Sequence, residues 1–159
     1  MTRDLLAYDR FTTILEWLLA VRERRIEVVN IVLVHVCLHD QQRLGDTYGA
    51  SEAHQMLSDL AEHLRQACRK SDLVARDGTD FWILVPYEVP ATVAERVATL
   101  VEVAAYNGLN IVDRDIGYYS LTPADGEIGE VFTSGAAFLA HLKAHRQTAY
   151  RWCHAEPAH

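Results

Sequence analysis

Basic side chains gather in one stretch of an otherwise acidic chain. The 159 residues carry 15 Lys+Arg against 22 Asp+Glu, which gives a formal net charge of −7. Four of the basic residues nevertheless fall within one short segment: Arg65, Arg69, Lys70 and Arg76. Asp72 lies in the same segment, three residues after Arg69. Guanidinium groups donate paired hydrogen bonds to anions, and a neighbouring carboxylate accepts from N–H donors. The segment therefore predicts a local site for an anionic ligand.

A second group with possible chemistry is the alternation of His35, Cys37 and His39. Alternate residues of a strand point to one face, so these side chains could offer three ligands to a borderline ion such as Zn²⁺. A buried His or Cys on a strand is also an ordinary core residue, and neither a carboxylate nor a fourth ligand is evident from the spacing. We therefore predict no metal site, and metal binding by these three residues stays an open alternative.

Composition limits the class of protein around these residues. A chain that is 50% hydrophobic and 23% charged is not disordered overall, and its length predicts one domain over residues 1–159. The acidic balance argues against nucleic-acid polymers as partners. Three cysteines without a CxxC pattern indicate free thiols in a reducing cytoplasm. No segment resembles a signal peptide or is long enough to insert into a membrane.

The hydrophobic pattern predicts an α+β fold with a central, mostly antiparallel sheet flanked by helices, as in ferredoxin-like and nucleotidyl-cyclase-like domains. Two short apolar runs joined by a Gly-containing turn predict a β-hairpin, which favours this fold over a doubly wound parallel sheet. The expected helices cover residues 11–21, 51–70, 90–108 and 131–146, the expected strands cover 26–38, 73–76, 81–85 and 111–121, and turns or loops cover 45–49, 77–80 and 123–129.

Several motifs in order resemble the GGDEF domain, the diguanylate cyclase family. They are the sequence Gly-Asp-Thr-Tyr-Gly at residues 45–49, the long helix that follows it, the sequence Arg-Lys-Ser-Asp-Leu-Val-Ala-Arg at 69–76, and Gly-Thr-Asp-Phe at 78–81. Weaker similarities continue through Ala-Glu-Arg at 94–96, Asp-Ile-Gly at 115–117 and Lys143. The resemblance covers nearly the whole chain and implies the nucleotidyl-cyclase-like fold.

The family's active members join two GTP molecules into cyclic di-GMP by two-metal phosphoryl transfer, and this sequence departs from their pattern at each required position. The metal-binding Asp at the end of the first strand corresponds to Cys37, and the second Asp of that motif to His39. The guanine-reading Asn and Asp correspond to Gly45 and His54. The resemblance therefore implies that both the metal ligands and the guanine readers are lost.

The signature hairpin is also changed. Its residues are Gly78, Thr79 and Asp80, so that Thr79 replaces the second Gly and Asp80 alone retains a carboxylate. Because Mg²⁺ requires oxygen ligands and one carboxylate cannot hold two ions, we predict a degenerate domain that is not an enzyme, has no catalytic residues and binds no Mg²⁺ cofactor.

A different family site is retained in this sequence. Many members bind cyclic di-GMP as an inhibitor at an Arg-x-x-Asp motif five residues before the hairpin, and Arg69 and Asp72 stand at that place. A further family Arg in the next helix corresponds to Arg96, and we add Arg65 and Arg76 as basic neighbours. The same tetrapeptide pattern also occurs at Arg43 and Asp46. The prediction therefore rests on the position of Arg69 and Asp72 five residues before the hairpin, and not on the pattern alone.

The sequence thus predicts a receptor for cyclic di-GMP that relays ligand level to a partner domain or protein, with a homodimer possible. The guanidinium suits guanine O6 and N7, and the carboxylate suits the guanine N1 and N2 donors. The alternative, from another class, is a dimerisation or protein-interaction scaffold that has lost nucleotide binding altogether.

Overall fold

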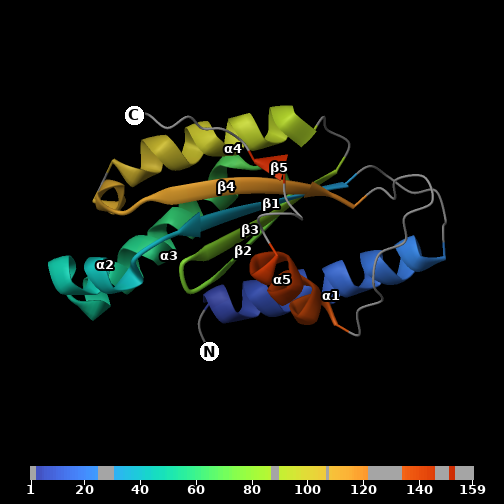
Figure 1. Cartoon of the computed structure of the whole chain (residues 1–159), viewed down its shortest axis with the longest axis horizontal. Coiled ribbons are helices and arrows are strands. Elements are labelled where there is room, and N and C mark those ends of the chain that lie inside the picture. Colours follow the sequence, from blue (N-terminus) through green and yellow to red (C-terminus); the bar gives the residue numbers. More distant parts are fainter. Residues whose placement is uncertain are drawn as a thin grey trace.

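Five strands form one antiparallel sheet with β1 at its centre (Figure 1). The computed structural model describes residues 3–24, 31–86, 90–106, 108–121, 134–145 and 151–152. The strands are β1 (Ile31–Leu38), β2 (Leu73–Asp77), β3 (Asp80–Pro86), β4 (Arg114–Ser120) and β5 (Arg151–Trp152), in the sheet order β2-β3-β1-β4-β5. The predicted α+β, nucleotidyl-cyclase-like architecture is confirmed.

Helices cover both faces of the sheet. Both faces of β1 carry apolar side chains, and each face is buried against a pair of helices. One set of alternating residues of β1 packs against α3 (Ala50–Ala67) and α4 (Pro90–Ala105). Leu33, on the other face, belongs to the core beneath α1 (Arg3–Glu23) and α5 (Gly135–Ala144). Figure 1 shows these two helices together on one side of the sheet. A central strand buried on both faces is what its continuous Val- and Leu-rich run predicts.

The segment expected as a turn at residues 45–49 is helical for most of its length, so that expectation was wrong. Helix α2 (Gln41–Tyr48) begins after Asp40, whose side chain accepts a hydrogen bond from the backbone N of Arg43 at 3.1 Å. The helix ends at Gly49, where φ is 88°. The cap at Asp40 satisfies a free backbone N–H of the first helical turn and so stabilises a helix over residues that are common in turns. The positive φ at Gly49 then ends the helix.

The long helix also ends earlier than expected. Helix α3 stops at Ala67, because Cys68 is extended with φ −90° and ψ 164°. Arg69 and Lys70 therefore lie in the connection to β2 rather than in the last helical turn. This change of two to three residues decides where the basic side chains point.

The predicted hairpin is confirmed. β2 and β3 pair antiparallel from Leu73 opposite Leu84 to Asp77 opposite Asp80, and Gly78 has a φ of 63° in the two-residue turn. The carbonyl oxygen of Thr79 accepts a hydrogen bond from the backbone N of Leu38 at 3.0 Å. The turn is thereby held against the end of the central strand.

The remaining expectations differ mainly at element ends. Residues 26–30 of the expected first strand and the expected loop at 123–129 lie outside the described residues. The last helix is shorter than expected, and a short 3₁₀ turn, η1 (Leu109–Ile111), precedes β4. The two-residue strand β5 was not predicted, since so short a segment carries no periodicity. None of the described helices combines the length and apolarity needed to cross a bilayer.

Candidate functional site

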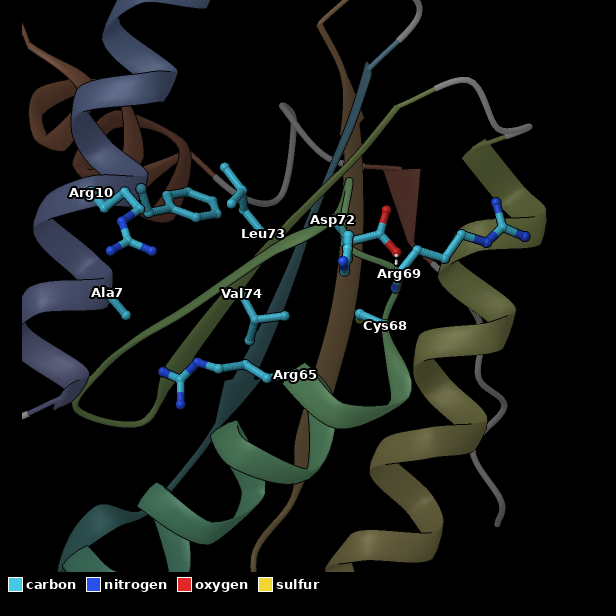
Figure 2. A pocket seen from close by; sticks show the side chains of 10 residues that line it. Ala7, Arg10, Arg65, Cys68, Arg69, Asp72, Leu73 and Val74 are labelled. Carbon is cyan, nitrogen blue, oxygen red and sulfur yellow. Dashed lines mark hydrogen bonds between the residues drawn. The ribbon is translucent and has the colours of Figure 1, made fainter.

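A basic cavity lies between α1, the end of α3 and the start of β2 (Figure 2). Its volume is about 360 Å³. Four cationic residues line it, namely Arg10, Arg65, Arg69 and Lys70, together with apolar groups of α1 and β2 and the carboxylate of Asp72. In Figure 2 the side chains of Arg10 and Arg65 point into the space between α1 and β2. Arg10 was not a candidate from the sequence, because only the fold brings α1 beside this segment.

The structure brings Arg69, Asp72 and Arg96 together on the α4 side of this cavity. The carboxylate of Asp72 accepts a hydrogen bond from the backbone N of Arg69 at 3.0 Å, and the backbone N of Asp72 donates to the Arg69 carbonyl oxygen at the same distance. A terminal nitrogen of Arg96 lies 3.9 Å from Asp72 Oδ2. Figure 2 shows the Arg69 side chain extending away from α1. A short turn and one helix thus position the three candidate ligand residues.

Asp72 retains unused hydrogen-bonding capacity in this cluster. Its side chain is only 1% exposed, yet Oδ1 has no hydrogen-bond partner among the described residues. A buried acceptor without a partner costs about 1–3 kcal/mol, and such groups are rare in folded proteins. The carboxylate can therefore gain free energy from any donor that reaches it.

Arg65 and Arg76 turn instead to Asp4 at the start of α1. Arg65 donates to Asp4 Oδ1 at 3.2 Å, and Arg76 Nε donates to Asp4 Oδ2 at 3.1 Å. Burial alone would raise the pKa of Asp4, but the hydrogen bonds from Arg76 and Arg65 outweigh it and hold that pKa below its ordinary value. A helix that continued to residue 70 would have placed Arg65 and Arg69 on one face. Because α3 ends at Ala67, between them, their side chains point in different directions.

Arg76 links three elements. Besides Asp4 of α1, it donates to the carbonyl oxygen of Gly78 at 2.6 Å, and its NH2 lies 3.2 Å from His54 Nδ1. The residue is only 6% exposed. A guanidinium so fully engaged acts as a structural tie between α1, α3 and the hairpin, and contact of Arg76 with a ligand stays a prediction.

A second polar cluster lies at positions that the family resemblance relates to the catalytic centre. Asp80 accepts from His35 Nε2 at 2.8 Å and from Lys143 Nζ at 2.6 Å. The His35 ring stacks on Trp82 with centroids 3.8 Å apart and planes 7° apart. Cys37 stands opposite Asp80 in the pairing of β1 and β3. The carboxylate therefore has an internal partner on each oxygen.

The pKa values of Asp80 and Lys143 are both shifted by these hydrogen bonds. Burial alone would raise the pKa of Asp80, but the hydrogen bonds from His35 and Lys143 outweigh it and lower that pKa. The bond to Asp80 in turn raises the pKa of Lys143. Helix α5 places the ammonium of Lys143 on Asp80 of the hairpin, although the side chain stays 52% exposed.

The donor atoms of this cluster do not suit Mg²⁺. His35, Cys37 and Asp80 offer one nitrogen, one sulfur and one carboxylate oxygen, all within 4.8 Å of one another. Mg²⁺ is a hard ion that takes oxygen ligands in octahedral geometry. The magnesium ions implied by the family resemblance therefore do not fit this set of side chains.

The other positions that the resemblance relates to the catalytic centre lie apart from that cluster. His39 binds Asp115 at 2.6 Å, so it does not join His35 and Cys37 as the sequence alternation allowed. Gly45 and His54 line a further cavity of about 390 Å³, whose wall also includes Asp4 and Gly78. Asp4 could not be predicted in this wall from the sequence, because only the fold brings α1 beside Gly45, His54 and the hairpin.

The sheet order and the hairpin beside the central strand define a nucleotidyl-cyclase-like domain. The family model described as "Diguanylate cyclase, GGDEF domain" matches residues 8–148. The chain belongs to the GGDEF family. No curated protein matches the sequence significantly.

Solved structures agree on the fold. The GGDEF domain of DgcB from Caulobacter crescentus, solved with c-di-GMP, is 20% identical over 86% of this chain and 83% of that one, with a TM-score of 0.58. The GGDEF domain of PA1120 (YfiN or TpbB) from Pseudomonas aeruginosa is 21% identical over 94% and 96%, also at 0.58. Diguanylate cyclase SiaD of Pseudomonas aeruginosa, solved with its activator SiaC, is 16% identical over 88% and 55%, at 0.55. At these identities the likeness is one of fold.

Proposed function

We propose that this GGDEF domain is a catalytically inactive receptor for cyclic di-GMP that binds through Arg69, Asp72 and Arg96. The observation that carries the proposal is the buried Asp72 carboxylate, which has one acceptor atom unused, accepts from the backbone N of Arg69 and lies 3.9 Å from the Arg96 side chain. DgcB, which shares the fold, was solved with the same dinucleotide.

The chemistry of the cluster matches the two parts of the ligand. A guanidinium can donate two parallel hydrogen bonds to guanine O6 and N7 or to a phosphate. The carboxylate of Asp72 can accept from the N1 and N2 donors of guanine, which would satisfy its unused oxygen. Arg10, Arg65 and Lys70 add positive charge around the same cavity, which favours a dianionic dinucleotide.

Inactivity is supported by the second cluster. Two-metal phosphoryl transfer needs carboxylate oxygens to hold the ions, whereas Cys37 offers sulfur and Asp80 already bonds His35 and Lys143. Gly45 and His54 provide neither of the family's guanine-reading side chains. GTP therefore lacks both its metal ligands and its base contacts.

Helix α1 is the element we propose to transmit binding to a partner. Its Arg10 and Phe11 line the basic cavity, and its Asp4 bonds Arg65 and Arg76. A ligand in the cavity would contact α1 directly and compete with Asp4 for Arg65. Ligand occupancy would thereby change how firmly α1 is held on the sheet.

Calorimetric titration with cyclic di-GMP tests the proposal. We expect saturable binding by the wild-type chain and its loss in Asp72→Ala, because that variant removes the acceptor but leaves the cavity open. Asp46→Ala, in the second Arg-x-x-Asp sequence on α2, is the matched control and should bind as the wild type does. Absence of heat at tens of micromolar ligand would favour the scaffold alternative.

A separate assay tests inactivity. Incubation of the purified domain with GTP and Mg²⁺ should yield no cyclic di-GMP. Any product that depends on the domain would contradict this part of the proposal and leave the binding part standing.

A further inference from the structure

We propose that His35, Cys37 and Asp80 form a binding site for a borderline divalent cation, best suited to Zn²⁺. This inference goes beyond the receptor function and does not depend on it. The sequence alone lacked a carboxylate near the alternating His and Cys residues, and the fold supplies one by pairing β3 with β1, so that Asp80 stands opposite Cys37.

The geometry is close to that of a three-ligand zinc site. The three donor atoms lie within 4.8 Å of one another. Zinc bonds of about 2.0–2.3 Å in a tetrahedron place ligand atoms roughly 3.3–3.8 Å apart, so shifts of about 1 Å or less bring these side chains onto one ion. Nitrogen, sulfur and oxygen ligands are the set that Zn²⁺ accepts, and the fourth position is left for water.

The surroundings hold these ligands in place before an ion arrives. His35 is fixed by its stacking on Trp82, and both Cys37 and Asp80 are buried on neighbouring central strands. Lys143 bonds the second oxygen of Asp80 from α5. An outer partner of this kind orients a ligating carboxylate. The site therefore needs little ordering on binding.

The charges also balance. A Cys37 thiolate and the Asp80 carboxylate neutralise the two positive charges of the ion, and His35 binds as neutral imidazole. The hydrogen bond between His35 Nε2 and Asp80 breaks when both residues bind the ion, and the proton on Nε2 moves to Nδ1 of the same ring or to solvent. The Cys37 thiol gives up its proton to solvent when the Zn–S bond forms, and no electron is transferred. Lys143 keeps its charge and its bond to the carboxylate.

Metal titration of the tag-free, chelator-treated chain tests the site. Zn²⁺ is measured by competition with a chromophoric chelator, and Co²⁺ reports sulfur ligation through its thiolate charge-transfer absorption. We expect one ion per chain and a charge-transfer band, with affinity at least tenfold weaker in Cys37→Ser and in His35→Gln. Zn²⁺ should also raise the thermal midpoint of the wild type and not that of Cys37→Ser.

The chain contains eight histidines, any of which could bind Zn²⁺ nonspecifically. Two matched variants distinguish the proposed site from such binding. Cys68 lies outside the cluster, and burial raises the pKa of its thiol, so Cys68→Ser should retain the band. His39 bonds Asp115 instead, so His39→Gln should retain the affinity. The proposal is overturned if the wild type takes up no stoichiometric ion, or if Cys37→Ser and His35→Gln bind as tightly as the wild type.

Discussion

The two ends of β2 carry polar clusters of opposite character. At its start, Asp72 is buried with one oxygen unused, while its other oxygen accepts from the backbone N of Arg69 and lies 3.9 Å from Arg96 of α4. At its far end, across the hairpin turn, Asp80 bonds His35 and Lys143 with both oxygens. Both carboxylates are buried, but only the first retains capacity for an external donor. The first carboxylate can accept a further hydrogen bond from a nucleotide, whereas both oxygens of the second already accept hydrogen bonds from the protein.

The largest effect on stability should come from a substitution beside the Asp80 cluster. Trp82 is 3% exposed and stacks on His35, so Trp82→Ala should lower the free energy of unfolding by about 3–5 kcal/mol, because a large buried side chain leaves a cavity. Urea denaturation measures this loss. Trp17 is 63% exposed, and Trp17→Ala should change stability by about 0.5 kcal/mol at most. Equal losses in the two variants would contradict the assigned core.

The Asp72 cluster should respond in binding and not in stability. Arg69→Ala should weaken cyclic di-GMP binding roughly 10- to 100-fold, since hydrogen bonds to charged groups contribute about 1.5–3 kcal/mol. Its unfolding free energy should stay within about 0.5 kcal/mol of the wild type. Arg43→Ala removes the matching exposed arginine of α2 and should leave binding unchanged. If both variants bind alike, Arg69 is not a ligand residue.

The attachment of α1 should be sensitive only to strong acid. Asp4→Asn should destabilise the domain by about 1–3 kcal/mol, because Arg76 then loses a buried charged partner. The pKa of Asp4 is lowered in the folded state, so its contribution is complete above the unfolded value of about 3.9 and is lost as pH falls through the lower folded value.

Denaturation at several pH values measures this dependence. The difference between wild type and Asp4→Asn should be constant from pH 7 to about pH 5 and should shrink below about pH 4. A difference that already changes near neutral pH would show that another group controls the attachment of α1.

A smaller effect is expected at Lys143, whose side chain is 52% exposed. Lys143→Ala should cost about 1 kcal/mol, because water screens the ion pair although Asp80 itself is buried. Lys70, the other lysine of the chain, is exposed and bonds no buried acid among the described contacts. Lys70→Ala should therefore leave unfolding unchanged in the same experiment, and an equal loss would contradict the role of the Lys143 bond.

The sequence predicted the parts of the molecule that local patterns control. A continuous apolar run located the central strand, and the Gly78 turn located the hairpin. Family resemblance pointed to Arg69, Asp72 and Arg96. The sequence did not predict the hydrogen bonds of Asp4 with Arg65 and Arg76, or that of Lys143 with Asp80, because they join residues more than 60 positions apart. Nor did it predict the α3 end at Ala67, which depends on one extended residue, Cys68.

The central claim is that one nucleotide site of this domain is open and the other is closed. Calorimetric titration of the same preparation with cyclic di-GMP and then with GTP in Mg²⁺ tests this claim most directly. We expect saturable heat from cyclic di-GMP and no binding of GTP at the same concentrations. Binding of GTP without binding of cyclic di-GMP would contradict the account.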